Sequence, residues 1–331
     1  MTKNRSLTRR GCLSAALGAG MLLGASGSAQ AQSLCVWDLL GTAGDGFALM
    51  RDYAVGVQKQ VQFDLKAFPK EDEAIKAYLD GSCDALVATS FTTRQLNPVT
   101  GSLNAIGAST TPAVASTAVK MLLSPRFSNF MTVKGHEVVG IIPQGSAYLL
   151  VRDRSLNTLE KVHNKRFAAI DIDQAQQYMI HKIGAQPVPV GLADFAHAFN
   201  SGDVDVVASP AMAIQPLELY QGMGSTGGII RFPVSYVTLD VVIHQDRFPA
   251  GFGAYSRNWF TTHMPRILRN VDRLEQGIKP QYWVNLSEAD QAGYRKLMGE
   301  MRRDLVAEGI YNAQLLKIME RICSQTAGCK P

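Results

Sequence analysis

The stretch VWDLLGTAGDGFALM, residues 36–50, runs from an apolar segment through a turn with three glycines into a helix-like pattern. This layout predicts a strand, a tight turn and a helix whose first backbone N–H groups point out of the turn. Nucleotide-binding proteins use the same layout to hold phosphate. The first question is therefore whether Gly41–Gly46 binds a phosphate group.

The spacing of the glycines argues against a nucleotide. The turn reads G-x-x-G-x-G, whereas the dinucleotide motif is G-x-G-x-x-G, and no lysine follows in a P-loop position. The acid expected at the end of the next strand is also missing, because that strand ends in Lys66-Ala67-Phe68. A helix N-terminus still suits an anionic or polar ligand. The alternative is that the glycines only permit a tight turn.

Alternating strands and helices continue on both sides of the middle of the chain. The first half predicts strands at 34–40, 61–68 and 84–90, with helices at 46–59 and 70–80 between them. The second half predicts strands at 166–172, 186–190 and 204–210, with helices at 174–183 and 193–200. Strands separated by helices of this length predict βαβ units and a parallel sheet in an α/β protein.

A short internal similarity supports two related halves. AYLDGSCDALVA, from Ala77, and AFNSGDVDVVAS, from Ala198, both end a helix at a glycine, place an aspartate three residues later and begin an apolar strand. Glycine suits a left-handed helix C-cap. Two similar α/β halves about 120 residues apart predict a bilobed architecture.

The segments between and after these halves predict the connections. Residues 135–160 and 229–249 are apolar and β-branched, and we expect them to be strands that cross between the lobes. The chain then predicts helices at 255–276 and 287–325, a helical C-terminal wrap in which Ser287 and Asp290 resemble an N-cap. The expected lobes are 32–145 plus about 241–275, and 146–240 plus about 276–331.

The first 31 residues predict a cleaved export signal. A basic head is followed by a small and apolar run at 11–28 and by Ala29-Gln30-Ala31, a small-x-small cleavage site. Arg9-Arg10 leaves both a twin-arginine signal and an ordinary Sec signal open. The signal holds four of the 33 basic residues and none of the 28 acidic ones, so the mature charge is 29 − 28 = +1. That balance gives no indication of nucleic-acid binding.

Four cysteines remain after the signal, and an even number in an exported chain favours disulfides over metal binding or catalysis. Four cysteines allow three pairings. We expect Cys35 to pair with Cys83, because each lies at the start of a predicted strand, and Cys323 to pair with Cys329 across a short tail loop.

No motif indicates an enzyme. The six histidines are scattered, and the segment beginning His136-Glu137 lacks the second histidine of a zinc protease. Asp171 and Asp173 follow a predicted strand; Asp173 is expected to cap the next helix, while Asp171 could face a cleft. We therefore expect no catalytic residues, no cofactor and no metal.

Residues 156–210, LNTLEKVHNKRFAAIDIDQAQQYMIHKIGAQPVPVGLADFAHAFNSGDVDVVASP, resemble the extracytoplasmic receptors of TRAP transporters. Further blocks are similar to a branch of periplasmic solute-binding proteins labelled as RND-efflux-associated. They are CVWDLLGTAGDGFALMRDYA, TGSLNAIGA, LELYQGMGSTGGIIRFP, RFPAGFGAYSRNWF and EGIYNAQLLKIM. The resemblance implies a bilobed, monomeric periplasmic protein that closes on a small polar or anionic solute and delivers it to a TRAP-type transporter. An accessory of an RND-type efflux system and an exported enzyme on this scaffold are the alternatives.

The TRAP receptors hold a substrate carboxylate with an arginine at a position that falls near Ala168 or Ala169 here, where no arginine stands. Arg94 could supply the charge instead, or it could be a solvated loop residue. Tyr148 and Tyr236 lie on the crossing strands, as cleft walls or as core residues. The residues expected to contact the ligand are Gly41, Thr42, Gly44, Asp45, Ser90, Phe91, Arg94, Tyr148, Asp171, Asp173, Gln174, Pro210, Ala211 and Tyr236.

Overall fold

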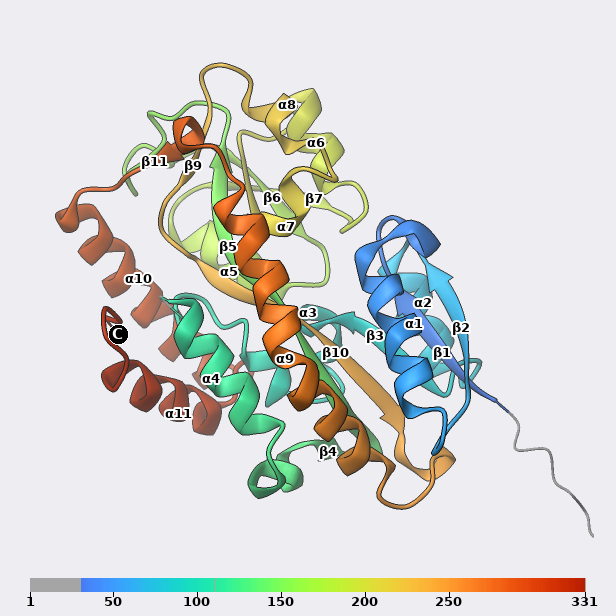
Figure 1. Cartoon of the computed structure of the whole chain (residues 1–331). Coiled ribbons are helices and arrows are strands. Elements are labelled where there is room, and N and C mark those ends of the chain that lie inside the picture. The colour runs from blue at the N-terminus through green and yellow to red at the C-terminus, as the bar shows by residue number, and fades with distance from the viewer. Residues whose placement is uncertain (1–30, 110, 331) are drawn as a thin grey trace, which may run out of the picture. The chain divides into compact units, whose positions relative to one another are not determined.

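The alternation of strands and helices is present in both halves of the chain, in a computed structural model that describes residues 31–109 and 111–330 (Figure 1). All of the predicted export signal except Ala31 lies outside the described residues. The first half contains β1 (Gln32–Trp37), η1 (Gly41–Ala43), α1 (Asp45–Val57), β2 (Phe63–Phe68), α2 (Glu71–Leu79), β3 (Ala85–Thr89), α3 (Ser90–Thr93), η2 (Thr100–Ser102), α4 (Pro112–Leu122), η3 (Pro125–Phe130) and β4 (Thr132–Val133).

The crossing strand β5 (His136–Val151) leads into the second half. That half contains β6 (Arg166–Ile170), α5 (Gln174–Lys182), β7 (Gln186–Val190), α6 (Phe195–Ser201), β8 (Val206–Pro210), α7 (Ala211–Ile214), α8 (Leu219–Met223) and β9 (Gly228–Ile230). The return strand β10 and the C-terminal elements follow: β10 (Ser235–His244), η4 (Gln245–Arg247), α9 (Phe252–Gln276), η5 (Pro280–Tyr282), β11 (Trp283–Val284), α10 (Glu288–Ala307) and α11 (Ala313–Ser324).

The strands form a mixed sheet with the order β2-β1-β3-β10-β5-β8-β6-β7. Within each half the strands are parallel as predicted: β1 pairs with β2 and β3, and β6 pairs with β7 and β8. The antiparallel pairs all involve the crossing strands, because β10 pairs with β3 and β5, and β5 pairs with β8. The predicted crossings at 135–160 and 229–249 therefore join two parallel units into the bilobed fold.

The pairing of the two crossing strands shifts at two positions, between Val237 and Thr238 and between Val241 and Val242, and the first of these lies nearer the second half. Val237 lies opposite Gly145 and Thr238 lies opposite Pro143, so Gln144 is an extra residue and forms a β-bulge. Gly145 has a φ of +100°, a left-handed conformation that favours glycine. A bulge redirects the strand locally, which sets the direction of the Gln144 side chain.

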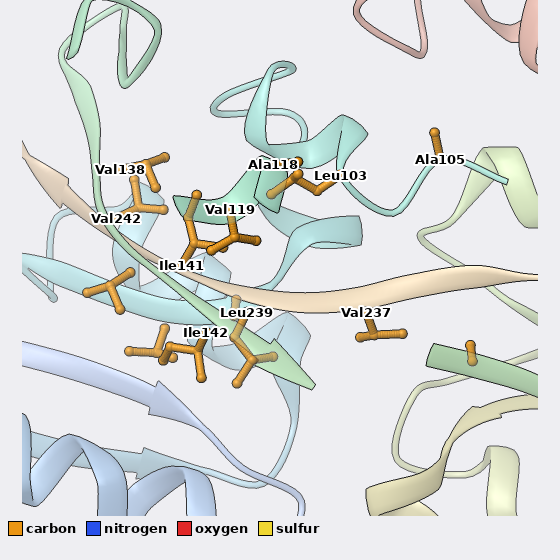
Figure 2. Packing of buried hydrophobic residues seen from close by; sticks show 14 of the residues in the cluster. Leu103, Ala105, Ala118, Val119, Val138, Ile141, Ile142, Val237, Leu239 and Val242 are labelled. Carbon is orange, nitrogen blue, oxygen red and sulfur yellow. The ribbon is translucent and has the colours of Figure 1, made fainter. Parts of the chain in front are cut away.

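The larger hydrophobic core lies along the crossing strands and extends into both halves, from β1 and β3 to β6 and α5. Ile141 of β5 lies near Val119 of α4, whereas Ile142 of β5 and its partner Leu239 of β10 lie on the other side of the strands (Figure 2), and all four are buried. Helix α4 was not predicted from the sequence. A second hydrophobic cluster, which includes Phe199 of α6, fills the rest of the second half.

Both predicted disulfides are confirmed. Cys35 on β1 is bonded to Cys83, which lies just before the neighbouring parallel strand β3, with a Cα–Cα distance of 6.0 Å. Cys323 and Cys329 are bonded at the end of α11, with a Cα–Cα distance of 5.3 Å. The glycines of the internal similarity, Gly81 and Gly202, both have positive φ as expected.

The C-terminal region is helical as predicted, with α9 along β5 (Figure 1). The predicted segment 287–325 consists of two helices, because Gly309 has a φ of +75° and the Asn312 side chain accepts a hydrogen bond from Leu315 N (2.9 Å) to begin α11. Ser287 caps α10 by accepting a hydrogen bond from Asp290 N (3.1 Å). None of the helices in the described part of the chain is long and apolar enough to span a membrane.

Candidate functional site

A cavity of about 340 Å³ lies between the two halves and against the crossing strands. The first half contributes the segment after β1 and the end of β3, and the second half contributes α5, α6 and the end of β8. Gln144 of the bulge and Ser235 of β10 form part of the wall between them. The cavity therefore has walls from both lobes and from the strands that connect them.

The walls of this cavity are mainly apolar. Aromatic rings come from both halves, with Trp37 and Phe91 on one side and Phe195 on the other, and Tyr311 comes from the C-terminal region. Nε1 of Trp37 is buried and has no hydrogen-bond partner within the described chain. Such a mixture of apolar walls with a few polar groups is typical of small-molecule sites.

Asp38 is the charged lining residue that was not predicted from the sequence. It directly follows β1, and its carboxylate accepts hydrogen bonds from Leu40 N (2.9 Å) and Phe47 N (3.0 Å). Phe47 lies in the first turn of α1, so the carboxylate lies at the positive end of that helix. An aspartate at the end of a strand before a glycine-containing turn was the signal in the sequence.

The glycines of the opening turn make room for this carboxylate. A Cβ atom on Gly44 would lie 1.9 Å from Asp38 Oδ1, and one on Gly46 would lie 2.8 Å from Asp38 Oδ2. The backbone N–H of Gly44 is also in use, since it donates to Gly41 O (3.3 Å). The turn thus holds an anion at a helix N-terminus, as its layout suggested, and the anion is a side chain of the same chain.

Asp173 occupies the corresponding place in the second half. It follows β6 and caps α5 by accepting a hydrogen bond from Ala175 N (3.2 Å), as predicted from the sequence. Its carboxylate also forms an ion pair with Arg94 of the first half, with 3.2 Å between NH1 and Oδ1. The side chains of Arg94 and Asp173 are only 11% and 10% exposed.

Arg94 is neither a solvated loop residue nor a lining residue of the cavity. Its Nε donates to Gly101 O (2.9 Å), its NH2 donates to Asn104 Oδ1 (2.5 Å), and its guanidinium lies 5.2 Å from the centre of the Tyr311 ring. These contacts hold the arginine behind the cavity wall. The ion pair with Asp173 connects the loop after β3 to the loop after β6.

Four of the residues expected to contact a ligand line the cavity: Asp45, Phe91, Asp173 and Pro210. The others lie around it without lining it, namely Gly41, Thr42, Gly44, Ser90, Arg94, Tyr148, Asp171, Gln174, Ala211 and Tyr236. Contact of any of them with a ligand stays a prediction. Several of them were predicted because they are neighbours of lining residues in the sequence. Side chains of neighbouring residues often point away from the cavity.

Tyr148 and Tyr236 are packed among buried side chains. The Tyr148 hydroxyl donates a hydrogen bond to Glu275 Oε1 (2.7 Å), and its ring meets Trp283 edge to face with 5.0 Å between ring centres. Tyr236 is 1% exposed, and burial raises the pKa of its hydroxyl. Burial away from water disfavours the charged phenolate.

A buried acid lies behind the cavity wall in the first half. Glu71, at the start of α2, accepts hydrogen bonds from the backbone N and the hydroxyl of Thr89, a residue that lines the cavity. Desolvation by burial raises the pKa of Glu71 to about 7, although the hydrogen bonds from Thr89 oppose that shift. In the described residues, no group of three or more His, Cys, Asp or Glu side chains could hold a metal ion.

Comparisons with known proteins agree with this architecture. The profile of the family described as solute-binding protein AdeT 1/2 matches residues 55–330. The chain is 36% identical over 288 residues to the probable solute-binding protein AdeT1 of Acinetobacter baumannii, covering 87% of this chain and 95% of that protein. It is 25% identical over 222 residues to the probable solute-binding protein AdeT2 of the same organism, covering 67% and 93%.

Solved structures of TRAP periplasmic solute-binding proteins share the fold. One from Desulfovibrio salexigens, with bound orotic acid, has a TM-score of 0.73 at 16% identity and covers 89% of this chain and 98% of its own. One from Ralstonia eutropha, with bound (S)-2-acetolactate, has a TM-score of 0.72 at 12% identity and covers 89% and 99%. The bilobed fold expected from the sequence is thereby confirmed, and the chain belongs to the AdeT 1/2 family of solute-binding proteins.

Proposed function

We propose that this solute-binding protein works in the periplasm, captures a small molecule in the cavity between its lobes and delivers it to a TRAP-type secondary transporter. The observation that carries the proposal is the cavity of about 340 Å³, whose walls come from both lobes and from the crossing strands. A ligand in that position touches both lobes at once. The export signal, the two disulfides and the fold shared with TRAP receptors support the compartment and the transport role.

Capture would proceed by hinge closure. Contacts made by both lobes exist only when the lobes are closed, so a ligand shifts the population toward the closed state. The bulge at Gln144 and the left-handed Gly145 lie within the part of β5 that pairs with β10, two residues before Ala147, where the pairing with β8 begins. This irregular point is where we place the hinge.

A thermal-shift screen of the purified protein against organic acids, amino acids, sugars, amines and aromatic compounds tests the proposal. A ligand present at 100 times its Kd should stabilise the folded protein by about 2.7 kcal/mol. Ala208 lines the cavity, and Ala208→Phe should abolish the shift by filling part of it. Ala254 is exposed on α9 and does not line the cavity, so Ala254→Phe is the matched control that should keep the shift.

The main competing role is that of an accessory to an RND-type efflux system that acts through its outer surface. In that case no solute class would stabilise the protein, and a purified efflux component would bind the wild type and the Ala208→Phe variant equally well. We also propose that the chain acts as a monomer and is a binding protein without catalytic activity, as its family and fold suggest.

A further inference from the structure

The charged residues that line the cavity are all acidic. They are Asp38, Asp45 and Asp173, and no lysine, arginine or histidine of the described chain lines this space. The first two come from the turn before and the start of α1, and the third comes from the start of α5. A solute held between the lobes therefore meets carboxylates from both sides.

Arg94 does not add a free positive charge that would attract an anion to the cavity. Arg94 forms its ion pair with Asp173 and donates its other recorded hydrogen bonds to Gly101 O and Asn104 Oδ1. It therefore compensates one of the three carboxylates. Asp38 and Asp45 form no ion pair among the described residues, so two negative charges facing the cavity lack a cation of the protein.

Asp38 is held in place while keeping capacity for a ligand. Its two recorded hydrogen bonds come from Leu40 N and Phe47 N, and a carboxylate offers about four acceptor sites. The close approach to Gly44 and Gly46 leaves the carboxylate little freedom to turn away. A ligand N–H donor or a cationic head could use the remaining acceptor sites without any rearrangement of the turn.

The apolar walls define the rest of the solute. Trp37 is the residue next to Asp38, and Phe91, Phe195 and Tyr311 also line the cavity. Aromatic rings attract cations through their electron-rich faces and bury apolar groups at the same time. A carboxylate solute would instead bring a third uncompensated negative charge next to Asp38 and Asp45, which like-charge repulsion disfavours.

We propose that the cavity binds a small organic cation, a protonated or quaternary amine on an apolar or aromatic body, with Asp38 and Asp45 as its counter-charges. The inference rests on the proposed function, because it assumes that this cavity is the capture site. It assigns a ligand charge opposite to that of the acids bound in the structurally similar TRAP proteins from Desulfovibrio and Ralstonia.

The test uses three probes with one body and different heads: 3-phenylpropylammonium, 3-phenylpropan-1-ol and 3-phenylpropanoate, titrated into the purified protein by calorimetry at pH 7. The ammonium should bind about tenfold more tightly than the alcohol, as charge-assisted hydrogen bonds do relative to neutral ones. The carboxylate should bind more weakly than the alcohol. Equal affinities, a preference for the carboxylate, or no binding of the ammonium would overturn the proposal.

Two substitutions test whether Asp38 and Asp45 are the carboxylates that bind the ammonium group. Asp38→Asn should weaken ammonium binding about tenfold and Asp45→Asn about two- to fivefold, because Asp45 is exposed and its charge is screened by water. In both variants alcohol binding should fall by a smaller factor than ammonium binding, and circular dichroism reports whether the fold is intact. Asp72→Asn is the matched control, since Asp72 is likewise exposed in the first turn of a helix but does not line the cavity.

The outcomes separate this inference from the proposed function. One outcome is that the 3-phenylpropylammonium probe does not bind while a neutral or anionic solute of the thermal-shift screen does. If Ala208→Phe abolishes that binding, the cavity is the capture site and only the proposed positive charge of the ligand is wrong. If no solute of any charge binds, the proposed function fails as well. Unchanged ammonium affinity in both aspartate variants would place the cation elsewhere on the protein.

Discussion

Two strand–turn–helix units approach the cavity from opposite lobes, and each places an aspartate at the N-terminus of its helix. In the first lobe Asp38 accepts hydrogen bonds from backbone N–H groups of the turn and of α1. In the second lobe Asp173 caps α5 and also pairs with Arg94 from the first lobe. The same local design therefore serves two purposes, because among the described residues Asp173 has a cation beside it and Asp38 does not.

The difference suggests a division of roles. The Arg94–Asp173 pair is buried and joins the lobes, so it resembles a structural contact that favours closure. Asp38 and Asp45 line the cavity with no ion-pair partner in the described part of the chain, and we propose that their charge serves a ligand. A helix N-terminus that looks like an anion site in a sequence can already hold an anion of the protein itself, and the ligand then meets the opposite sign.

Loss of the ion pair in the second unit should have the largest effect on stability. Arg94→Met leaves the nearly buried Asp173 carboxylate without its partner, and breaking such a pair lowers the free energy of unfolding by about 3 to 5 kcal/mol. Urea unfolding of the wild type and the variant measures this loss of unfolding free energy. The double variant Arg94→Met/Asp173→Asn should recover most of the loss, because asparagine still caps α5. A loss below about 1 kcal/mol in the single variant would show that the pair does not hold the lobes together.

Glu71, the buried acid behind the cavity wall of the first half, should make the stability of the fold depend on pH. Burial raises the pKa of Glu71 from 4.5 to about 7, so the folded state holds a proton that the unfolded state releases in that range. This contribution to stability is full below pH 4.5 and is lost as the pH rises toward 7, by about 3 kcal/mol in total at 1.36 kcal/mol per unit.

Glu71→Gln removes this dependence, since the amide does not titrate in that range. Its unfolding free energy, measured from pH 4 to 8, should fall less with rising pH than that of the wild type. Glu73→Gln is the control, because Glu73 lies exposed in the same helix turn and its replacement should leave the slope unchanged. An identical slope in the Glu71 variant would mean that Glu71 is ionised in the folded protein throughout this range.

Adding a side chain to the turn before α1 should lower the unfolding free energy by an intermediate amount. Gly44→Ala places a methyl group against the Asp38 carboxylate, and such overpacking lowers the unfolding free energy by about 1 to 3 kcal/mol. In an Asp38→Ala background the same substitution should have little effect, because the clash is gone. Gly299→Ala, in the interior of α10 with ordinary contacts of 3.7 Å or more, is the control and should not destabilise. Equal losses in both backgrounds would show that Asp38 is not what Gly44 accommodates.

Neutralising the exposed acid of the first unit should have the smallest effect on stability. Asp45→Asn removes a charge from the first turn of α1, which lowers the unfolding free energy by about 0.5 kcal/mol through the helix dipole. Thermal unfolding at low ionic strength measures this change. A loss of several kcal/mol would assign Asp45 a structural role like that of Asp173 and remove it from the ligand site.

Much of the architecture could be predicted from the sequence because it depends on local pattern. The alternating strands and helices, the glycine ends of α2 and α6, the Asp173 cap and the pairing of Cys35 with Cys83 follow from periodicity and turn chemistry. Helix α4 was missed although Thr111 and Pro112 at its start are typical of a helix N-terminus. Blocks resembling known receptors supplied the family.

The site was less predictable because side-chain direction and distant partners are not local properties. Gly41, Thr42 and Gly44 were named for the turn they form, whereas the group that faces the cavity is Asp38, a few residues earlier. Gln144 reaches the cavity wall only because β5 carries a bulge opposite β10. Arg94 could be read as a ligand-binding charge until its partner from the other lobe was known.

The sequence predicted an export signal, and it correctly indicated the two α/β halves, the crossing strands and the family, since each depends on residues that are neighbours along the chain. The folded structure established which charged residues line the cavity. Their net charge depends on which carboxylates find a cation across the cleft, and Arg94 reaches Asp173 over 79 residues of separation while no such partner reaches Asp38 in the described chain. Electrostatic balance at a site is a sum over residues brought together by folding, and no single segment of the sequence contains it.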